Sequence, residues 1–298
     1  MSRAPKSQES ASPQDSFGGL ALAVLTYFLW GFLPIYMKLM SHIPPVEVVV
    51  HRIIWSVPIA LVILIVIGRT KELRTALTTP NMLGMACLTA ALVSINWGIY
   101  VWTITSGNAL EAALGYYINP LFSVFLGAVL LGERLAKLQW AAIALAFGAV
   151  VILTVDAGRL PLAAIGLTLS WGFYAFFKKK LSIGPNQGFT LEVLILAVPS
   201  LAYWAYLGAN GESHFRSNIW LMLGCGVVTA IPLMMYANAA KKLRLTTIGI
   251  LQYIAPTIIF LVAVFLFGEP FGQARLIAFP LIWAALILYS ISLIRGRR

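Results

Sequence analysis

The amino-acid sequence predicts an all-α membrane protein whose ten transmembrane helices form two inverted five-helix repeats. Three observations predict this fold: a strongly apolar composition, ten segments long enough to span a bilayer, and a duplication of the first half in the second. The chain has 298 residues, of which 60% are hydrophobic and only 10% charged. Soluble domains carry about 25% charged residues. The composition therefore excludes an ordinary soluble domain.

The apolar segments each approach the roughly 20 residues that a helix needs to cross about 30 Å of hydrocarbon. Backbone polar groups in lipid must be hydrogen-bonded within their own segment, so we expect these segments to be helices. The ten expected spans are 17–38, 45–68, 81–104, 110–132, 137–155, 160–178, 188–208, 217–240, 245–267 and 273–294.

The polar segment 1–16 precedes the first span and is rich in Ser and Pro, which is typical of a disordered tail. With this tail in the cytoplasm and the spans alternating, 16 of the 21 Lys and Arg residues fall on the cytoplasmic side. Cytoplasmic loops carry an excess of Lys and Arg, so this asymmetry predicts that both termini are cytoplasmic. It also explains the formal charge of +11 without a nucleic-acid partner.

The duplication is clearest between residues 115–135 and 251–271, which read GYYINPLFSVFLGAVLLGERL and LQYIAPTIIFLVAVFLFGEPF. We expect a first repeat over 17–155 and a second over 160–294. Because five is odd, the second repeat enters the membrane upside down. Secondary transporters use such inverted repeats for alternating access around a site near the bilayer midplane. Matches at an offset of 136 include Tyr117 with Tyr253, Pro120 with Pro256, and Gly132-Glu133 with Gly268-Glu269.

The ten spans, the duplicated halves and the Gly-Glu pair that ends the fourth span of each half resemble the drug/metabolite transporter superfamily, within its EamA-like families. Further segments are similar to the RarD group, which is named for chloramphenicol sensitivity. They are WGFLPIYMK (30–38), HRIIWS (51–56), INWGIYVW (95–102), ALGYYINPL (113–121), LQYIAPT (251–257) and FGEP (267–270).

The resemblance covers 17–294 and implies a permease or exporter of small amphipathic metabolites or drugs in the bacterial inner membrane. It does not fix the substrate. The alternatives are a passive channel or a membrane receptor. An enzyme is disfavoured because the sequence lacks acidic metal motifs and His-Glu-x-x-His. We expect no cofactor, metal or nucleic-acid partner, and a monomer or homodimer whose partners are the small-molecule substrate and the lipid bilayer.

The resemblance also implies that the third, fourth, eighth and ninth spans, with the first and sixth, surround a central cavity. Polar groups inside spans are costly and usually face the protein interior, so those in these spans are candidates for substrate binding. Aromatic faces with a few hydrogen-bonding groups suit an amphipathic or aromatic solute. An interfacial aromatic belt is the alternative. The candidates are Trp30, Asn96, Trp97, Tyr100, Tyr116, Tyr117, Asn119, Trp171, Tyr174, Tyr236, Asn238, Gln252 and Tyr253.

Charged residues near the outer ends of the first two spans allow two interpretations. In the functional interpretation, Glu47 pairs with Lys38 or Arg52 in a gate, the group forms an anion-attracting outer mouth, or Glu47 and His51, one turn apart, form a protonatable relay. They could instead anchor the helices at the interface, where long basic side chains extend toward water. The candidates for gating or ion pairing are Lys38, Glu47, His51 and Arg52.

Two prolines and two glutamates complete the set of candidate residues. Pro120 and Pro256 each remove one helical hydrogen bond and are expected to kink their helices. Glu133 and Glu269 lie at helix C-termini, where the helix dipole disfavours a carboxylate. We therefore expect each glutamate to have a specific partner.

Overall fold

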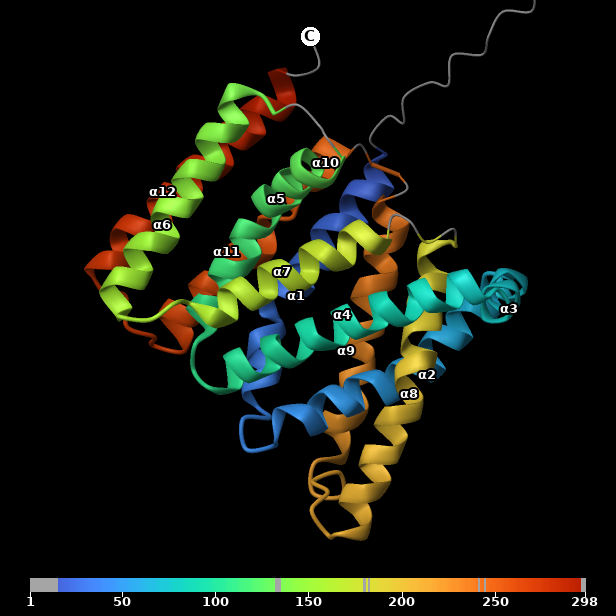
Figure 1. The fold of residues 1–298 in the computed structure, drawn as a ribbon. Helices are drawn as coiled ribbons and strands as arrows, with labels where there is room; N and C mark the ends of the chain where they lie inside the picture. Colours follow the sequence, from blue (N-terminus) through green and yellow to red (C-terminus); the bar gives the residue numbers. More distant parts are fainter. Residues whose placement is uncertain are drawn as a thin grey trace, which may run out of the picture.

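The computed structural model describes residues 16–131, 135–178, 181, 183–240, 242–243 and 245–295. Every regular element in these ranges is a helix (Figure 1). The elements are α1 (Phe17–Lys38), α2 (Pro45–Val66), α3 (Thr70–Thr78), α4 (Pro80–Thr105), α5 (Ala109–Leu131), α6 (Lys137–Ala157), α7 (Leu162–Lys178), α8 (Pro185–Ala209), α9 (Ile219–Ala240), α10 (Leu245–Leu251), α11 (Ile254–Leu261), the π-helix η1 (Val262–Leu266) and α12 (Gln273–Arg295).

The described helices account for the ten predicted spans. Eight of them are long and apolar enough to cross a membrane: α1, α2, α4, α5, α6, α8, α9 and α12. Two shorter apolar segments, Leu162–Lys178 and Ile254–Leu266, lie at the sixth and ninth predicted spans. The predicted all-α, ten-helix fold class is confirmed.

The contacts between helices repeat when the two halves are exchanged. α4 packs against α7, and the equivalent helices α9 and α1 pack against each other. The pairs α5–α7 and α11–α1 are related in the same way, as are α2–α9 and α8–α4. The pairs α6–α12 and α2–α8 each consist of two equivalent helices, one from each half, so exchanging the halves leaves these contacts unchanged. Figure 1 shows α6 beside α12 at one edge of the bundle. This pattern is the pseudo-twofold relation expected of two inverted repeats.

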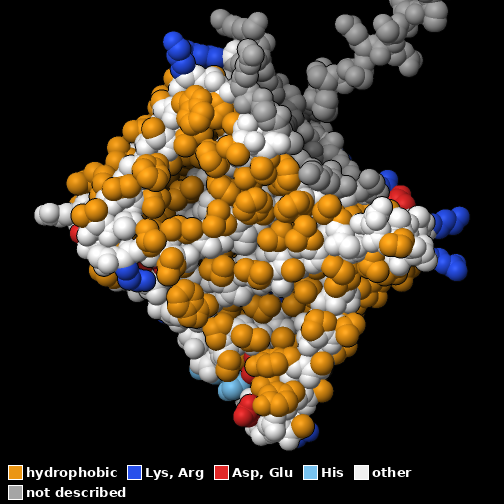
Figure 2. Space-filling view, in the orientation of Figure 1, with side chains coloured by type: hydrophobic (Ala, Val, Ile, Leu, Met, Phe, Trp, Pro, Cys, Tyr) orange, Lys and Arg blue, Asp and Glu red, His pale blue; other side chains and the backbone are white. Residues whose placement is uncertain are grey.

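The outside of the bundle is apolar. Figure 2 shows a face covered mainly by hydrophobic side chains, with Lys, Arg, Asp and Glu at its edges. Phe147 and Phe265 are 70% and 79% exposed, respectively. Contiguous apolar surface of this kind suits contact with lipid. The chain is a multi-pass integral membrane protein.

A short helix that the sequence analysis did not predict lies between α2 and α4. α3 buries Leu73 and Ala76 and packs against α8. The Glu72 carboxylate on α3 accepts a hydrogen bond from the Gln187 side chain on α8. At nine residues, α3 is too short to cross a bilayer, so the number of spans is unchanged.

The ninth span, predicted as one helix over 245–267, is interrupted. α10 ends at Leu251 and α11 begins at Ile254, with a turn at Gln252 between them. Pro256 explains the position of the break. It has no N–H to donate to the Gln252 carbonyl four residues earlier, and its ring crowds that carbonyl.

The equivalent proline in the first repeat does not break its helix. Pro120 lies inside α5, which is continuous from Ala109 to Leu131. The second repeat departs further from α-helical geometry at η1, where the Phe267 N–H donates to the Val262 carbonyl at 2.9 Å. The two halves therefore share a helix arrangement but differ in the fourth spanning segment.

Glu269, which follows η1, has the specific partner that its position predicted. Its carboxylate accepts hydrogen bonds from the backbone N–H groups of Ala109 and Leu110, the latter at 3.0 Å. These groups open α5, where the free N–H groups and helix dipole favour a negative charge. Burial raises the pKa of the Glu269 carboxyl, and the two N–H donors oppose this shift. Glu133 and residues 1–15 of the predicted tail lie outside the described residues.

Candidate functional site

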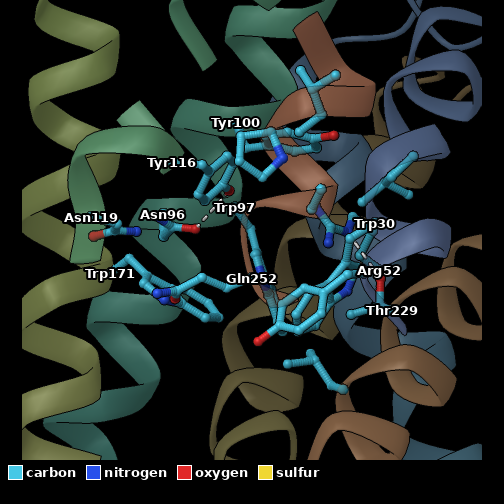
Figure 3. A pocket seen from close by; sticks show the side chains of 16 residues that line it. Trp30, Arg52, Asn96, Trp97, Tyr100, Tyr116, Asn119, Trp171, Thr229 and Gln252 are labelled. Atoms are coloured by element: carbon cyan, nitrogen blue, oxygen red, sulfur yellow. Dashed lines mark hydrogen bonds between the residues drawn. The ribbon is translucent and has the colours of Figure 1, made fainter. Parts of the chain in front are cut away.

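A cavity lies between the two halves of the bundle, where side chains from α1, α2, α4, α5, α7, α9 and α11 meet (Figure 3). It holds about 770 Å³ of space free of protein atoms, including some that is open to solvent. Aromatic and polar side chains make up most of its wall. The lining residues are Tyr27, Trp30, Leu33, Arg52, Asn96, Trp97, Tyr100, Tyr116, Asn119, Trp171, Thr229, Leu233, Gln252, Ala255, Pro256 and Ile259.

Helical spacing brings the polar groups of α4 and α5 to this wall. Asn96 and Tyr100 are one turn apart on α4, and Tyr116 and Asn119 are nearly one turn apart on α5. Residues three or four apart share a helix face. The Tyr100 and Tyr116 rings pack together, with centroids 5.9 Å apart.

Asn96 joins the two repeats at the cavity wall. Its Nδ2 donates to Ser170 Oγ at 2.9 Å and to the Leu167 carbonyl at 3.2 Å, both on α7. Its Oδ1 accepts from the Tyr116 hydroxyl at 3.4 Å (Figure 3). Asn96 therefore fixes α4 against α7 as well as lining the cavity.

Arg52 carries the one formal charge among the lining residues. It is 3% exposed, and its Nε donates to Thr229 Oγ1 at 3.0 Å (Figure 3). The guanidinium carbon lies 5.1 Å from the centroid of the Trp97 ring, within range for a cation–π interaction. Arg52 Nη1, Tyr100 Oη and Asn119 Oδ1 are all buried without a hydrogen-bond partner among the described residues. The wall thus presents several polar atoms whose hydrogen-bonding capacity is unused.

Eight of the thirteen predicted substrate-binding residues line this cavity. Pro256, one of the two predicted kinks, lines it too. Contact between these eight residues and a substrate stays a prediction. The eight are Trp30, Asn96, Trp97, Tyr100, Tyr116, Asn119, Trp171 and Gln252.

Two of the remaining five candidates lie next to the lining residues. The Tyr236 ring contacts the Trp30 ring, with centroids 5.5 Å apart. Tyr174 packs against Trp171, with centroids 5.3 Å apart, and its hydroxyl donates to Glu192 Oε2 at 3.2 Å. These tyrosines support the aromatic wall from outside.

The other three, Tyr117, Asn238 and Tyr253, do not line the cavity. Asn238 Nδ2 donates to the Met234 carbonyl at 2.7 Å. The Tyr117 hydroxyl lies 2.8 Å from Thr257 Oγ1, and the Tyr253 hydroxyl is buried without a partner among the described residues. Tyr117 does not line the cavity, because its side chain packs against Thr257 and Phe279 instead.

The predicted gate residues separate into different environments. Glu47 is fully buried, and its carboxylate accepts hydrogen bonds from the His214 N–H at 2.7 Å and from Ser213 Oγ at 3.2 Å. Its Oε2 also lies 2.7 Å from His214 Nδ1, and its Oε1 lies 4.0 Å from His51 Nε2. The structure therefore pairs Glu47 with the α8–α9 loop, not with Lys38 or Arg52 as considered from the sequence.

The basic candidates do not both extend toward the interface. Lys38 is the last residue of α1, and its Nζ lies 5.5 Å from the centroid of the Phe267 ring. Arg52 instead points into the cavity, where α9 covers it through Thr229. The interfacial interpretation of Arg52 is therefore wrong.

Sequence reasoning missed an ion pair in the second repeat. Glu192 is 145 residues after Glu47 and is likewise buried, and its Oε1 lies 2.5 Å from Lys178 Nζ. The repeat pointed to Glu192 but gave no indication of its partner. Thr229 was also missed, although a hydroxyl within an apolar span was an available signal. The apolar lining residues carry no signal that distinguishes them from residues facing lipid.

The helical bundle and its central cavity define a class of protein, a membrane transporter built from two related halves. The model of the EamA-like transporter family matches residues 17–155 and again residues 160–291. The chain belongs to this family, and its similarity to proteins named RarD places it in the RarD group.

Known relatives match along nearly the whole chain. An uncharacterized transporter of Vibrio cholerae serotype O1 is 41% identical over 283 residues, which cover 93% of each chain. Protein RarD of Salmonella typhi is 37% identical over 284 residues, covering 94% of this chain and 97% of the relative. A solved crystal structure of a protein 20% identical to this chain superimposes with a TM-score of 0.61, covering 94% of this chain and 99% of the other. That likeness shows the shared fold.

Proposed function

We propose that this protein is a secondary transporter that moves small amphipathic metabolites or drugs across the bacterial inner membrane by alternating access. The observation that carries the proposal is a cavity whose wall comes from both repeats, with Asn96 and Tyr100 from the first repeat and Trp171 and Thr229 from the second. Movement of one repeat against the other would change the side from which such a cavity is reached.

The chemistry of the wall supports an amphipathic solute. Trp30, Trp97 and Trp171 offer apolar ring faces, while Tyr100 and Asn119 offer hydrogen-bonding groups. Binding sites for small molecules commonly combine an apolar lining with a few placed polar groups. The interrupted helix at Gln252 adds irregular backbone beside the cavity, as in other carriers with broken helices.

Flux through reconstituted protein tests the proposal. Purified full-length protein in proteoliposomes is expected to exchange a labelled solute against the same unlabelled solute inside. Tyr100→Ala combined with Asn119→Ala is expected to reduce exchange without lowering membrane abundance. Trp220→Ala is the matched control, because Trp220 is 83% exposed on the bundle surface. Unchanged exchange in the double variant would remove these residues from the substrate site.

Chloramphenicol is one probe for this assay, since the RarD group is named for sensitivity to it. Amphipathic metabolites that raise the melting temperature of the purified protein supply the others. A carrier accumulates labelled solute transiently during exchange, whereas a passive channel only equilibrates it and a receptor moves none. Equilibration of the labelled solute without transient accumulation would indicate a passive channel and not a carrier.

The proposed orientation places both termini in the cytoplasm, with α3 inside and the α8–α9 loop outside. Single cysteines at Arg74 in α3 and at Glu212 in that loop test it, in a Cys87→Ala, Cys225→Ala background. Both positions are exposed. Maleimide that cannot cross the membrane is expected to label only the second in intact cells. Labelling of both positions, or of the first alone, would overturn this orientation.

A further inference from the structure

Arg52 is a buried cation without a counter-ion in the part of the chain that the structure describes. Its Nε is occupied by Thr229, whereas its buried Nη1 has no partner there. No ion pair joins it to a described carboxylate. A guanidinium stays protonated in proteins, so this charge is not relieved by loss of a proton.

The buried carboxylates of the described chain are already engaged. Glu47 binds the α8–α9 loop, Glu192 binds Lys178, and Glu269 caps α5. None of the sixteen described lining residues is acidic. The hydroxyl groups that share the cavity wall with Arg52 are those of Tyr27, Thr229, Tyr100 and Tyr116, which are neutral at pH 7. None of these groups therefore carries a negative charge that balances the charge of Arg52.

An unpaired charge inside a membrane protein is costly, and residues of this kind usually mark substrate or ion pathways. We propose that Arg52 is the counter-ion for an anionic group of the transported solute. The inference rests on the proposed transport function, since it treats the cavity as the substrate site, and it adds the chemical class: an aromatic carboxylate.

The rest of the wall favours a single negative charge on a flat apolar body. Arg52 offers one positive charge, which matches a carboxylate better than a doubly charged phosphate monoester. The unpartnered Tyr100 hydroxyl can donate a second hydrogen bond in the same cavity. Trp30 and Trp171 pack edge to face, with centroids 6.5 Å apart, and present aromatic surface to the remainder of the solute.

Three probes with the same indole ring test the charge requirement. They are indole-3-acetate, its neutral amide indole-3-acetamide, and the cation tryptamine. Binding is measured on the full-length protein at pH 7 in a neutral detergent by displacement of tritiated indole-3-acetate, so the readout does not depend on flux. We expect the carboxylate to bind at least about tenfold more tightly than the amide, because charge-assisted hydrogen bonds are the stronger ones. Inorganic phosphate at equal ionic strength is expected not to compete.

Variants of Arg52 assign the preference to this residue. Arg52→Gln is expected to lower the affinity for indole-3-acetate roughly 10- to 100-fold and to leave the affinity for the amide nearly unchanged. Arg52→Lys is expected to retain part of the preference, because it keeps the charge but loses the planar fork. Arg74→Gln is the matched control, since it removes an exposed Arg from α3.

Two results would overturn the inference: equal binding of carboxylate and amide by the wild-type protein, or a preference that survives in Arg52→Gln. The wild-type comparison decides alone if Arg52→Gln fails to fold. Binding of the carboxylate through Arg52 without flux of any probe would refute the transport function and leave the anion site. Flux of chloramphenicol or the amide, without preferential binding of the carboxylate, would refute the anion site and leave the transport function.

Discussion

His214 Nδ1 lies 2.7 Å from a carboxylate oxygen of Glu47, which ties the α8–α9 loop to the first turn of α2. The same carboxylate accepts the His214 backbone N–H, so both the side chain and the backbone of the loop residue are held. Glu47 is fully buried beneath the loop. The loop is thereby fastened to the first repeat although it belongs to the second.

Removal of this carboxylate is expected to release the loop. Glu47→Ala leaves the partly buried His214 N–H and Ser213 hydroxyl without their acceptor, at a cost of about 1 kcal/mol for each hydrogen bond lost. We expect a lower thermal midpoint and faster proteolysis within residues 210–218. Glu212→Ala changes an exposed acid of the same loop and serves as the control. Equal destabilisation by both variants would contradict a specific role for Glu47.

The Lys178–Glu192 pair allows a double-mutant cycle in the second repeat. Glu192→Gln leaves Lys178 without its counter-charge in a largely buried site, which is expected to destabilise the protein by about 3 kcal/mol. Lys178→Met is made alone and together with Glu192→Gln, and the double variant, which carries neither charge, should recover most of that loss. Denaturation of the purified variants measures the coupling. Additive losses in the double variant would show that the two side chains do not interact appreciably.

The fold was predictable because its signals are local and repeated. Apolar segments of about 20 residues and a duplicated Tyr-Ile-x-Pro motif do not depend on how helices pack. α3 escaped prediction because nine amphipathic residues resemble a polar loop in a search for apolar segments. The break at Gln252 escaped because Pro120 and Pro256 look equivalent in sequence, yet only the second interrupts its helix.

The site was only partly predictable because lining a cavity depends on helix rotation and on what covers each helix. Asn96, Tyr100 and Asn119 lie on the predicted wall, whereas Tyr253 does not line it. Arg52 was misplaced for a related reason. The sequence shows its distance from the start of a span but not that α9 packs over that part of α2.

A close approach of α2 and α9 gives a prediction about packing. A Cβ added at Gly226 would overlap the backbone carbonyl of Trp55, which cannot move as a flexible side chain can. Gly226→Ala is therefore expected to destabilise the protein by about 1–3 kcal/mol. At Gly148 on α6 an added Cβ meets nothing within 4 Å, so Gly148→Ala should be neutral or slightly stabilising. Melting temperatures that fall equally in both variants would contradict this packing.

Pro120 and Pro256 form a matched pair for testing whether the interrupted helix matters to transport. Pro256→Ala restores an N–H that can donate to the Gln252 carbonyl, so α10 and α11 are expected to join and amide exchange over 252–257 to slow at least about tenfold. If movement at the break accompanies alternating access, solute exchange in proteoliposomes should fall several-fold. Pro120→Ala changes a continuous helix and is expected to alter both measurements much less. Slower amide exchange with undiminished solute exchange would show that the break is a structural feature of the second repeat and not a moving part of the carrier.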